Sequence, residues 1–491
     1  MSALEVRLPR QVVWPAVLLA TGGVVGLFAS GVRGSDTLLG AGIALAFFAL
    51  GVANWRLSAA ALAVYTVFAG FVTIATYPAT ATASLAKDLL FVAPIYVGLL
   101  ADPEARRSVR MLWDEHRWVG RCVIAFVAVV VLQVFNPSLP SIVVGLVGLR
   151  VWALYLPFLL VGFTLARQGR AMSTLRYLAA VSTLPLLIGV AQAALMRAGQ
   201  ADLATFWYGE AGPAITQRFA TFEIGGGVIT RVASTLPHTA QYFALTMAGT
   251  AVGLALVSAD ARRSPAHRAF LGLAVVAGLL SGARGALFSV PLLVAIFLLV
   301  PGRRRAGSEA GGPRRAGSRA GIAALAALGL VVGSAVLRID TVETVTYLGE
   351  VASAEFTDLV IDGTSEALDA TTLGLGAGSN TNAARYVSAE GTLVVDRWLE
   401  SWYVKALVEL GVVGLVVQVA LVLSLMLALL GVARRGSAPR GLVAAAVALI
   451  GWTALYAVKG GFMDTEPMNL LFWFVPGLAL GAAPPPTVGD R

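Results

Sequence analysis

The sequence contains few charged residues for its length. Only 13% of its 491 residues are Asp, Glu, Lys or Arg, whereas 58% are hydrophobic. Soluble domains usually carry about a quarter charged residues, so this chain has too little polar surface for several soluble domains. We therefore expect the lipid bilayer to be the main environment of the protein.

Cysteine and recognisable cofactor motifs are also scarce. The single cysteine, Cys122, excludes an intramolecular disulfide and a metal site built from several thiolates. The sequence has no GxxxxGK[S/T] phosphate-binding loop, no HExxH pair and no His/Cys metal spacing, so we expect neither a metal nor another cofactor. The net charge is +9, but the arginines stand in short clusters between apolar stretches, which disfavours nucleic-acid binding.

Long apolar stretches recur along nearly the whole chain. Stretches of about 17 to 25 residues match the hydrocarbon core of a bilayer when they are helical. Because they are continuous and do not alternate with period two, they predict helices rather than a barrel. The expected fold is an all-α integral membrane protein with about fourteen transmembrane helices. The predicted spans are 11–30, 37–54, 58–76, 84–100, 121–135, 150–166, 177–196, 238–258, 269–282, 285–301, 320–336, 402–430, 441–458 and 467–483.

The arginines between the spans predict the orientation. Loops 101–121, 167–176, 259–268, 302–319 and 431–440 carry 5, 3, 3, 6 and 3 arginines, and all five fall on one side of a fourteen-span arrangement. Short loops rich in basic residues stay in the cytoplasm. Both termini are therefore expected inside, and the segments 136–149, 197–237, 282–284, 337–401 and 459–466 are expected outside.

One outer segment is much longer than the others. Residues 337–401 hold eleven acidic and three basic residues, which is typical of a translocated loop. The chain then divides into membrane helices in 1–336, this large acidic loop in 337–401, and further helices with a short tail in 402–491. Within the loop, the stretch LGLGAGSN contains Gly374, Gly376 and Gly378, which predict tight turns or a close backbone approach.

Several arginines lie at or beside the predicted outer face, against the usual trend. These are Arg150, Arg218, Arg231 and Arg284, the last in SGARGAL between two apolar runs. An arginine near membrane depth can simply extend its side chain to the headgroups. It can also bind an anion, because its planar fork of donors matches phosphate oxygens. Several on one side favour the diphosphate head of a lipid as the ligand.

Three other outer residues are candidates for binding or catalysis. His238 is a possible general base, although a helix-capping role also fits its position before a span. Glu400 stands at the entry of the span after the acidic loop, where a carboxylate can accept a hydroxyl proton or simply favour the helix dipole. Tyr403 is a candidate substrate contact or an interfacial aromatic residue.

Four segments in this order resemble the O-antigen ligase and Wzy polymerase family of membrane glycosyltransferases. They are the segment from Arg231 to Tyr242, the S-x-x-R-G-A-L of Ser281 to Leu287, the long loop with G-x-G-x-G, and the helix entry Y-V-x-x-L-V-E-L-G-x-x-G-L. The resemblance covers residues 215 to 420. Each motif is loose, and the ordered set is moderately specific.

The resemblance implies metal-independent transfer from an undecaprenyl-diphosphate-linked glycan. It implies that Arg231 and Arg284 hold the lipid diphosphate and that the residue at the helix entry, here Glu400, deprotonates the acceptor hydroxyl. In addition, we expect substrate binding by Arg218, Arg150, His238, Tyr403, Gly376 and Gly378. Ligases similar to this chain usually have a His-Asn pair where this sequence has Glu400 and Ser401, a departure that the polymerase branch tolerates better.

The expected function is polymerisation of lipid-linked repeat units at the outer face of a bacterial inner membrane. The expected partners are the lipid-linked donor, the glycan acceptor, membrane lipids and a protein that regulates chain length. Two alternatives stay open. One is ligation of a finished glycan to a lipid or protein acceptor, and the other is a transporter or flippase, which also has many spans with buried charges.

Overall fold

The computed structural model describes residues 45–46, 48–75, 87–211, 221–224, 227–259, 264–283, 285–301, 350, 353–354, 356–381 and 400–484. The predicted spans 11–30 and 320–336 lie outside these residues. Within them the chain is almost entirely helical, apart from one short antiparallel pair of strands, β1 (Thr221–Ile224) and β2 (Gly227–Thr230).

Five helical stretches are long and apolar enough to cross a membrane. They are α8 (Arg117–Val134), the stretch Ile142–Arg167, α11 (Ala171–Arg197), α14 (Thr239–Ala259) and α20 (Trp402–Arg435). The stretch Ile142–Arg167 consists of α9 (Ile142–Ala153) and α10 (Phe158–Arg167). The shorter apolar helices are the stretch Asp88–Ala101, α15 (Pro265–Leu280), α16 (Ala286–Leu299), α21 (Arg440–Tyr456) and α22 (Met468–Gly481). The chain is thus an all-α membrane protein, as the apolar stretches predict.

The chain divides into two compact units, Met1–Arg107 and Ser108–Arg491. The first contains α3 (Trp55–Val67), α4 (Ala69–Ala75), the π-helix η1 (Asp88–Val92) and α6 (Ala93–Ala101). Helix α3 packs against α6. At one end of this pair, the indole N–H of Trp55 donates to Asp102 Oδ2 at 3.0 Å, and Arg56 forms an ion pair with the same carboxylate.

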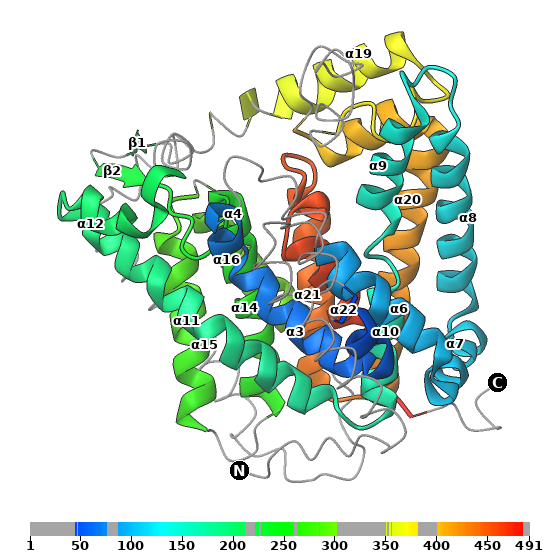
Figure 1. Ribbon diagram of the computed structural model, residues 1–491, viewed down its shortest axis with the longest axis horizontal. Coiled ribbons are helices and arrows are strands. Elements are labelled where there is room, and N and C mark those ends of the chain that lie inside the picture. The colour runs from blue at the N-terminus through cyan, green and yellow to red at the C-terminus, as the bar shows by residue number, and fades with distance from the viewer. Residues whose placement is uncertain are drawn as a thin grey trace, which may run out of the picture. The chain divides into compact units, whose positions relative to one another are not determined.

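In the second unit, α14 is the central helix. It packs against α11, α15, α16, α21 and α22 (Figure 1). Most of its side chains are buried. Helices α10 and α22 pack closely through glycines: a Cβ on Gly477 would lie 2.2 Å from Leu159 O, and a Cβ on Gly481 would lie 2.4 Å from Phe163 O. Such small residues let membrane helices approach backbone to backbone.

Several predicted loops contain helices. Most of 101–121 is helical, because α7 (Pro103–Glu115) buries Ala105 and Leu112 and exposes its arginines, as an amphipathic helix at a membrane surface would. The predicted outer segment 136–149 contains the first two thirds of α9. The predicted span begins at Arg150, whereas Arg150 lies in the last turn of α9, where a cation is favoured by the helix dipole.

The two longest predicted loops also hold ordered elements. Segment 197–237 contains α12 (Ala201–Thr205) and the 3-10 helix η2 (Phe206–Ala211), in addition to the two strands. The acidic loop 337–401 contains the π-helix η3 (Thr357–Asp362) and α19 (Gly363–Ala370). Packing of apolar residues explains part of this order, because Ala367 of α19 is buried against Val404 and Leu407 of α20.

Arg167, the last residue of α10, is the centre of a polar cluster in the second unit. Its guanidinium bonds the Glu115 carboxylate and donates to Ala483 O at 2.5 Å. Burial raises the pKa of Glu115, an effect that Arg167 opposes. Burial, together with the positive charges of Arg435 and Arg167, lowers the pKa of His116 to about 4. His116 is therefore held in its neutral form.

Candidate functional site

Helix α20 is broken at Gly411, which has a left-handed φ of 74°. The break leaves backbone N–H and C=O groups without partners inside the helix, and the stretch 371–381 forms hydrogen bonds with them. The N–H of Val412 donates to Thr372 O at 3.0 Å, and the N–H of Leu375 donates to Val408 O at 2.7 Å. Because unpaired backbone groups are costly within a membrane protein, the break and this stretch stabilise each other. We call residues 371–381 the glycine loop.

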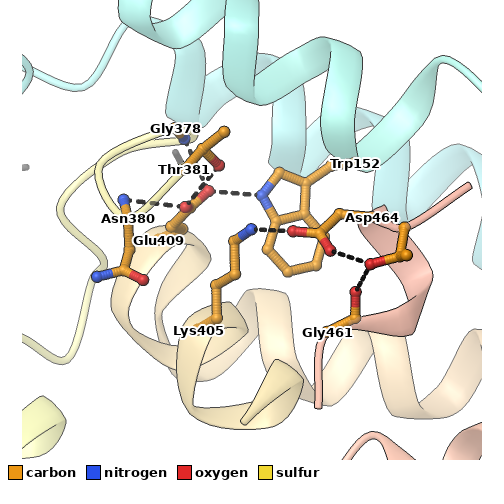
Figure 2. Close-up of polar contacts among 9 residues, drawn as sticks. Trp152, Gly378, Asn380, Thr381, Lys405, Glu409, Gly461 and Asp464 are labelled. Carbon is orange, nitrogen blue, oxygen red and sulfur yellow. Dashed lines mark hydrogen bonds and ion pairs between the residues drawn. The ribbon is translucent and has the colours of Figure 1, made fainter. Parts of the chain in front are cut away.

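The carboxylate of Glu409 anchors the glycine loop (Figure 2). Glu409 is fully buried in α20. Its Oε2 accepts from the indole N–H of Trp152 and from the N–H of Gly378, both at 2.7 Å. Its Oε1 accepts from the N–H of Asn380 and from the hydroxyl of Thr381, both at 3.0 Å. Four donors therefore compensate the desolvation of this buried carboxylate.

Helices α8 and α9 hold the glycine loop from the other side. The Gln133 side chain donates to Leu373 O at 2.7 Å, and that of Asn136 donates to Gly374 O at 2.9 Å. A Cβ on Gly148 of α9 would lie 2.2 Å from the carbonyl carbon of Ala377, so the loop lies directly on the α9 backbone. The predicted close approach and tight turns are confirmed, with φ of +92°, +101° and +94° at Gly374, Gly376 and Gly378.

A buried lysine lies one helical turn before Glu409. Lys405 Nζ bonds Asp464 Oδ2 at 2.7 Å, and only 2% of the lysine side chain is exposed, against 21% for Asp464. The ammonium also lies 5.1 Å from the ring of Trp402 and 5.9 Å from that of Trp152, and the two rings contact each other in a tilted arrangement with their centroids 4.3 Å apart. The ion pair is thus shielded by aromatic rings on the lysine side and reaches solvent on the Asp464 side.

The segment that carries Arg231 is fixed by a separate polar network. Ser234 has a φ of 55°, which a non-glycine residue rarely adopts. Its N–H donates to Gln192 Oε1 at 2.8 Å, and its carbonyl accepts from the Tyr208 hydroxyl at 3.0 Å. The Gln192 side chain in turn donates to Tyr208. Such an over-determined backbone outlier is typical of functional segments.

This segment lies against the turn between α15 and α16. The N–H of Val232 donates to Ser281 O at 3.1 Å, and a Cβ on Gly282 would lie 2.6 Å from Arg231 Cα. Arg284 itself lies outside the described residues. On the far side of the turn, a Cβ on Gly285 would lie 3.2 Å from the Tyr456 ring. The structure therefore brings Arg231 next to the turn that contains Arg284.

Further contacts connect the turn between α15 and α16 to α20 and α22. Tyr456 ends α21, and the N–H of Trp402 donates to Ala457 O at 3.0 Å. The Lys405–Asp464 ion pair then links α20 to the segment before α22. One end of the helix bundle thus gathers the starts of α14, α16, α20 and α22 with the ends of α15 and α21. We call this end the junction face.

The remaining predicted site residues take different positions. Glu400 is exposed and directly precedes the N-cap Ser401 of α20, so its predicted place at the helix entry is confirmed. His238 is exposed, and its carbonyl accepts the first helical bonds of α14. The Tyr403 hydroxyl donates to Ala454 O at 2.8 Å and holds α20 against α21. Arg150 is partly buried in α9, and Arg218 lies outside the described residues.

The predicted substrate contacts Gly376 and Gly378 lie where the glycine loop is bonded to Glu409. Both are buried, the Gly376 N–H donates to the backbone carbonyl of Glu409 at 3.1 Å, and the Gly378 N–H donates to its carboxylate. Their geometry therefore gives them a structural role in seating the loop.

Sequence reasoning missed Glu409 and Asp464 as central residues. In the sequence, Glu409 lies in an apolar run four residues after Lys405, and Asp464 forms a D-x-E with Glu466; neither pattern by itself indicates a central residue. A carboxylate within a membrane span usually has a specific partner, and that signal could have pointed to Glu409. Its partners on the glycine loop and α9 could not be read from spacing.

Comparison with known proteins adds no constraint to this site. No protein family model matches the chain, and no curated protein matches it either. The argument on function therefore depends on the residues and on their geometry.

Proposed function

We propose that this chain is a membrane glycosyltransferase that polymerises lipid-diphosphate-linked oligosaccharide repeat units at the outer face of a bacterial inner membrane. The observation that carries the proposal is the junction face, where Arg231, the turn around Arg284 and the Lys405–Asp464 pair come from four separate segments. In the fourteen-span arrangement all of them lie outside, where lipid-linked glycans are exposed.

The arginines suit the leaving group of this reaction. Transfer breaks the bond between the anomeric carbon of the donor sugar and the diphosphate oxygen, and the electron pair stays on that oxygen. Guanidinium groups stabilise such charge strongly where water is partly excluded. Arg231 is partly buried on a fixed segment, which suits this role.

The acceptor hydroxyl must lose a proton as it attacks the anomeric carbon. The sequence nominates Glu400 as the proton acceptor, and the structure adds Asp464 as a second candidate. Glu400 is exposed at the start of α20, whereas Asp464 is partly buried and held in place by Lys405. Glu409 is a poor candidate, because it is fully buried and its carboxylate already accepts four hydrogen bonds.

The broken helix α20 also bears on the transporter alternative. Transporters often coordinate their substrate through the unwound backbone of a discontinuous helix. Here the glycine loop occupies the break at Gly411 and bonds its backbone groups. The break therefore supports a fixed architecture better than it supports a transport site.

Glycan products from a strain lacking this chain and complemented with variants test the proposal. We expect Arg284→Ala to accumulate single lipid-linked repeat units at unchanged protein level. Accumulation of long, unattached lipid-linked chains would instead identify a ligase. Loss of substrate from the outer face, with no change in chain length, would identify a transporter.

The same strain separates the two candidate proton acceptors. Glu400→Gln and Asp464→Asn each remove one carboxylate at nearly constant size. Because Asp464→Asn also leaves Lys405 without its ion-pair partner, the matched control is Lys405→Met with Asp464→Asn. Loss of polymer in one single variant, with normal protein level, assigns the role to that residue. Unchanged chain length and yield in both would remove both from the mechanism.

A further inference from the structure

A small cavity lies behind Trp402, between the two segments of α20 and helix α22. Aromatic rings of Trp152, Tyr155, Trp402 and Trp473 form much of its wall. Two amide side chains also line it, Gln418 from the second segment of α20 and Asn469 from the first turn of α22. The cavity lies apart from the proposed diphosphate site around Arg231.

Three of the residues that line the cavity each carry a buried polar atom that has no hydrogen-bond partner within the described part of the chain. These atoms are Trp402 Nε1, Gln418 Oε1 and Asn469 Oδ1. The three residues are 2%, 3% and 4% exposed. Buried polar groups of folded proteins are nearly always hydrogen-bonded, either to protein or to ordered water. Three such atoms around one cavity therefore point to an occupant.

The chemistry of the three atoms restricts what this occupant is. The indole nitrogen can only donate, whereas the two amide oxygens can only accept. An anion would face two acceptors, and a cation would face the indole N–H. A hydroxyl group can accept from the indole but can donate only one hydrogen bond, whereas a water molecule can accept from the indole and donate to both amide oxygens. The cavity has room for only about one water molecule.

We propose that this cavity is an internal hydration site, in which buried water accepts from Trp402 and donates to Gln418 and Asn469. Buried waters typically make about three hydrogen bonds to otherwise unpaired groups. The water links both segments of the broken helix to α22 and fixes the indole that shields the Lys405–Asp464 pair. It therefore stabilises the wall of the junction face without taking part in transfer.

The sign of a stability change tests this proposal. In a dry cavity, Gln418→Met would remove an unpaired acceptor at similar volume and raise the melting temperature in lipid nanodiscs. In a hydrated cavity it removes a partner of the water, so we expect a lower melting temperature. Asn469→Leu is expected to act in the same direction. The two together should lower it by less than the sum of the single effects, because they share the water.

Gln192→Met is the matched control, because Gln192 is a buried glutamine whose bonds to Ala204, Tyr208 and Ser234 are all within the protein. It must lower the melting temperature. A rise for Gln418→Met and Asn469→Leu beside this loss would overturn the hydration site.

A high-resolution electron cryo-microscopy map of the unmodified protein in nanodiscs gives an independent reading. A compact peak within hydrogen-bond distance of Trp402 Nε1 and at least one of the amide oxygens supports buried water. Elongated density that extends out of the cavity would indicate an organic molecule bound through its hydroxyl group, and a cavity without density would indicate that it has no occupant. Either of these two results contradicts the proposal.

Discussion

Glu409 is the residue whose replacement should disturb the glycine loop most. Its carboxylate accepts from Trp152, Gly378, Asn380 and Thr381 at 2.7 to 3.0 Å with no exposure to water. In Glu409→Gln, one oxygen becomes an NH₂ group that faces two donors. Whichever oxygen is replaced, at least one N–H group loses its acceptor, while the volume of the side chain hardly changes.

The cost can be graded along a series of variants. Thr381→Val removes one hydroxyl donor and should cost about 1–2 kcal/mol. Glu409→Gln loses at least one charge-assisted bond, and we expect about 1.5–3 kcal/mol. Glu409→Ala leaves the N–H groups of Trp152, Gly378 and Asn380 without this acceptor, at about 1–3 kcal/mol each. Stability should therefore fall in the order Thr381→Val, Glu409→Gln, Glu409→Ala.

Thermal unfolding in nanodiscs and limited proteolysis between residues 371 and 381 measure this series. The matched control is Glu400→Gln, the same substitution at an exposed position, which should leave the melting temperature unchanged. If Glu409→Gln has the same melting temperature as the parent protein and is cleaved no faster, the anchoring role of Glu409 is refuted.

Three further predictions follow from other contacts. Lys405→Met should lower the melting temperature less than Asp464→Asn, because the latter leaves a buried ammonium unpaired, and the double variant should recover part of the loss. The lowered pKa of His116 predicts that stability is greatest above pH 6.5, the ordinary pKa of histidine, and declines as the pH falls toward about 4, because the unfolded chain binds the proton more tightly. In His116→Leu, the melting temperature should depend less on pH across this range. Gly148→Ala should expose the glycine loop to protease, because its Cβ would lie 2.2 Å from the Ala377 backbone, whereas the same change at Gly272, which has open space around it, should not.

Sequence alone predicted the helical membrane fold because long apolar runs respond to one dominant constraint, the thickness of the bilayer. The predicted span boundaries differ from the observed helix ends. Arg150 is the clearest case, because α9 begins eight residues before it, at Ile142. The break at Gly411 was also not predicted, since a glycine in an apolar run has the same local signature whether or not a distant loop fills the space beside it.

The candidate site was predicted only in part. The segment that carries Arg231 contacts the turn after α15 at Ser281 and Gly282, and Arg284 lies outside the described residues. The anchoring of the glycine loop by Glu409 depends on residues 31 positions away at Gly378 and 257 away at Trp152, and such contacts follow from tertiary packing. The Lys405–Asp464 ion pair could not be predicted either, because it also depends on tertiary packing.

Transfer by the purified protein tests the central claim most directly. The substrate is the lipid-linked repeat unit extracted from a strain that lacks this chain, reconstituted with the protein in proteoliposomes. We predict glycan chains longer than one repeat and one lipid diphosphate released for each new glycosidic bond, with both products lost in Arg284→Ala. Repeat units that cross the membrane or stay single, with no lipid diphosphate released by the unmodified protein, would contradict the proposed function.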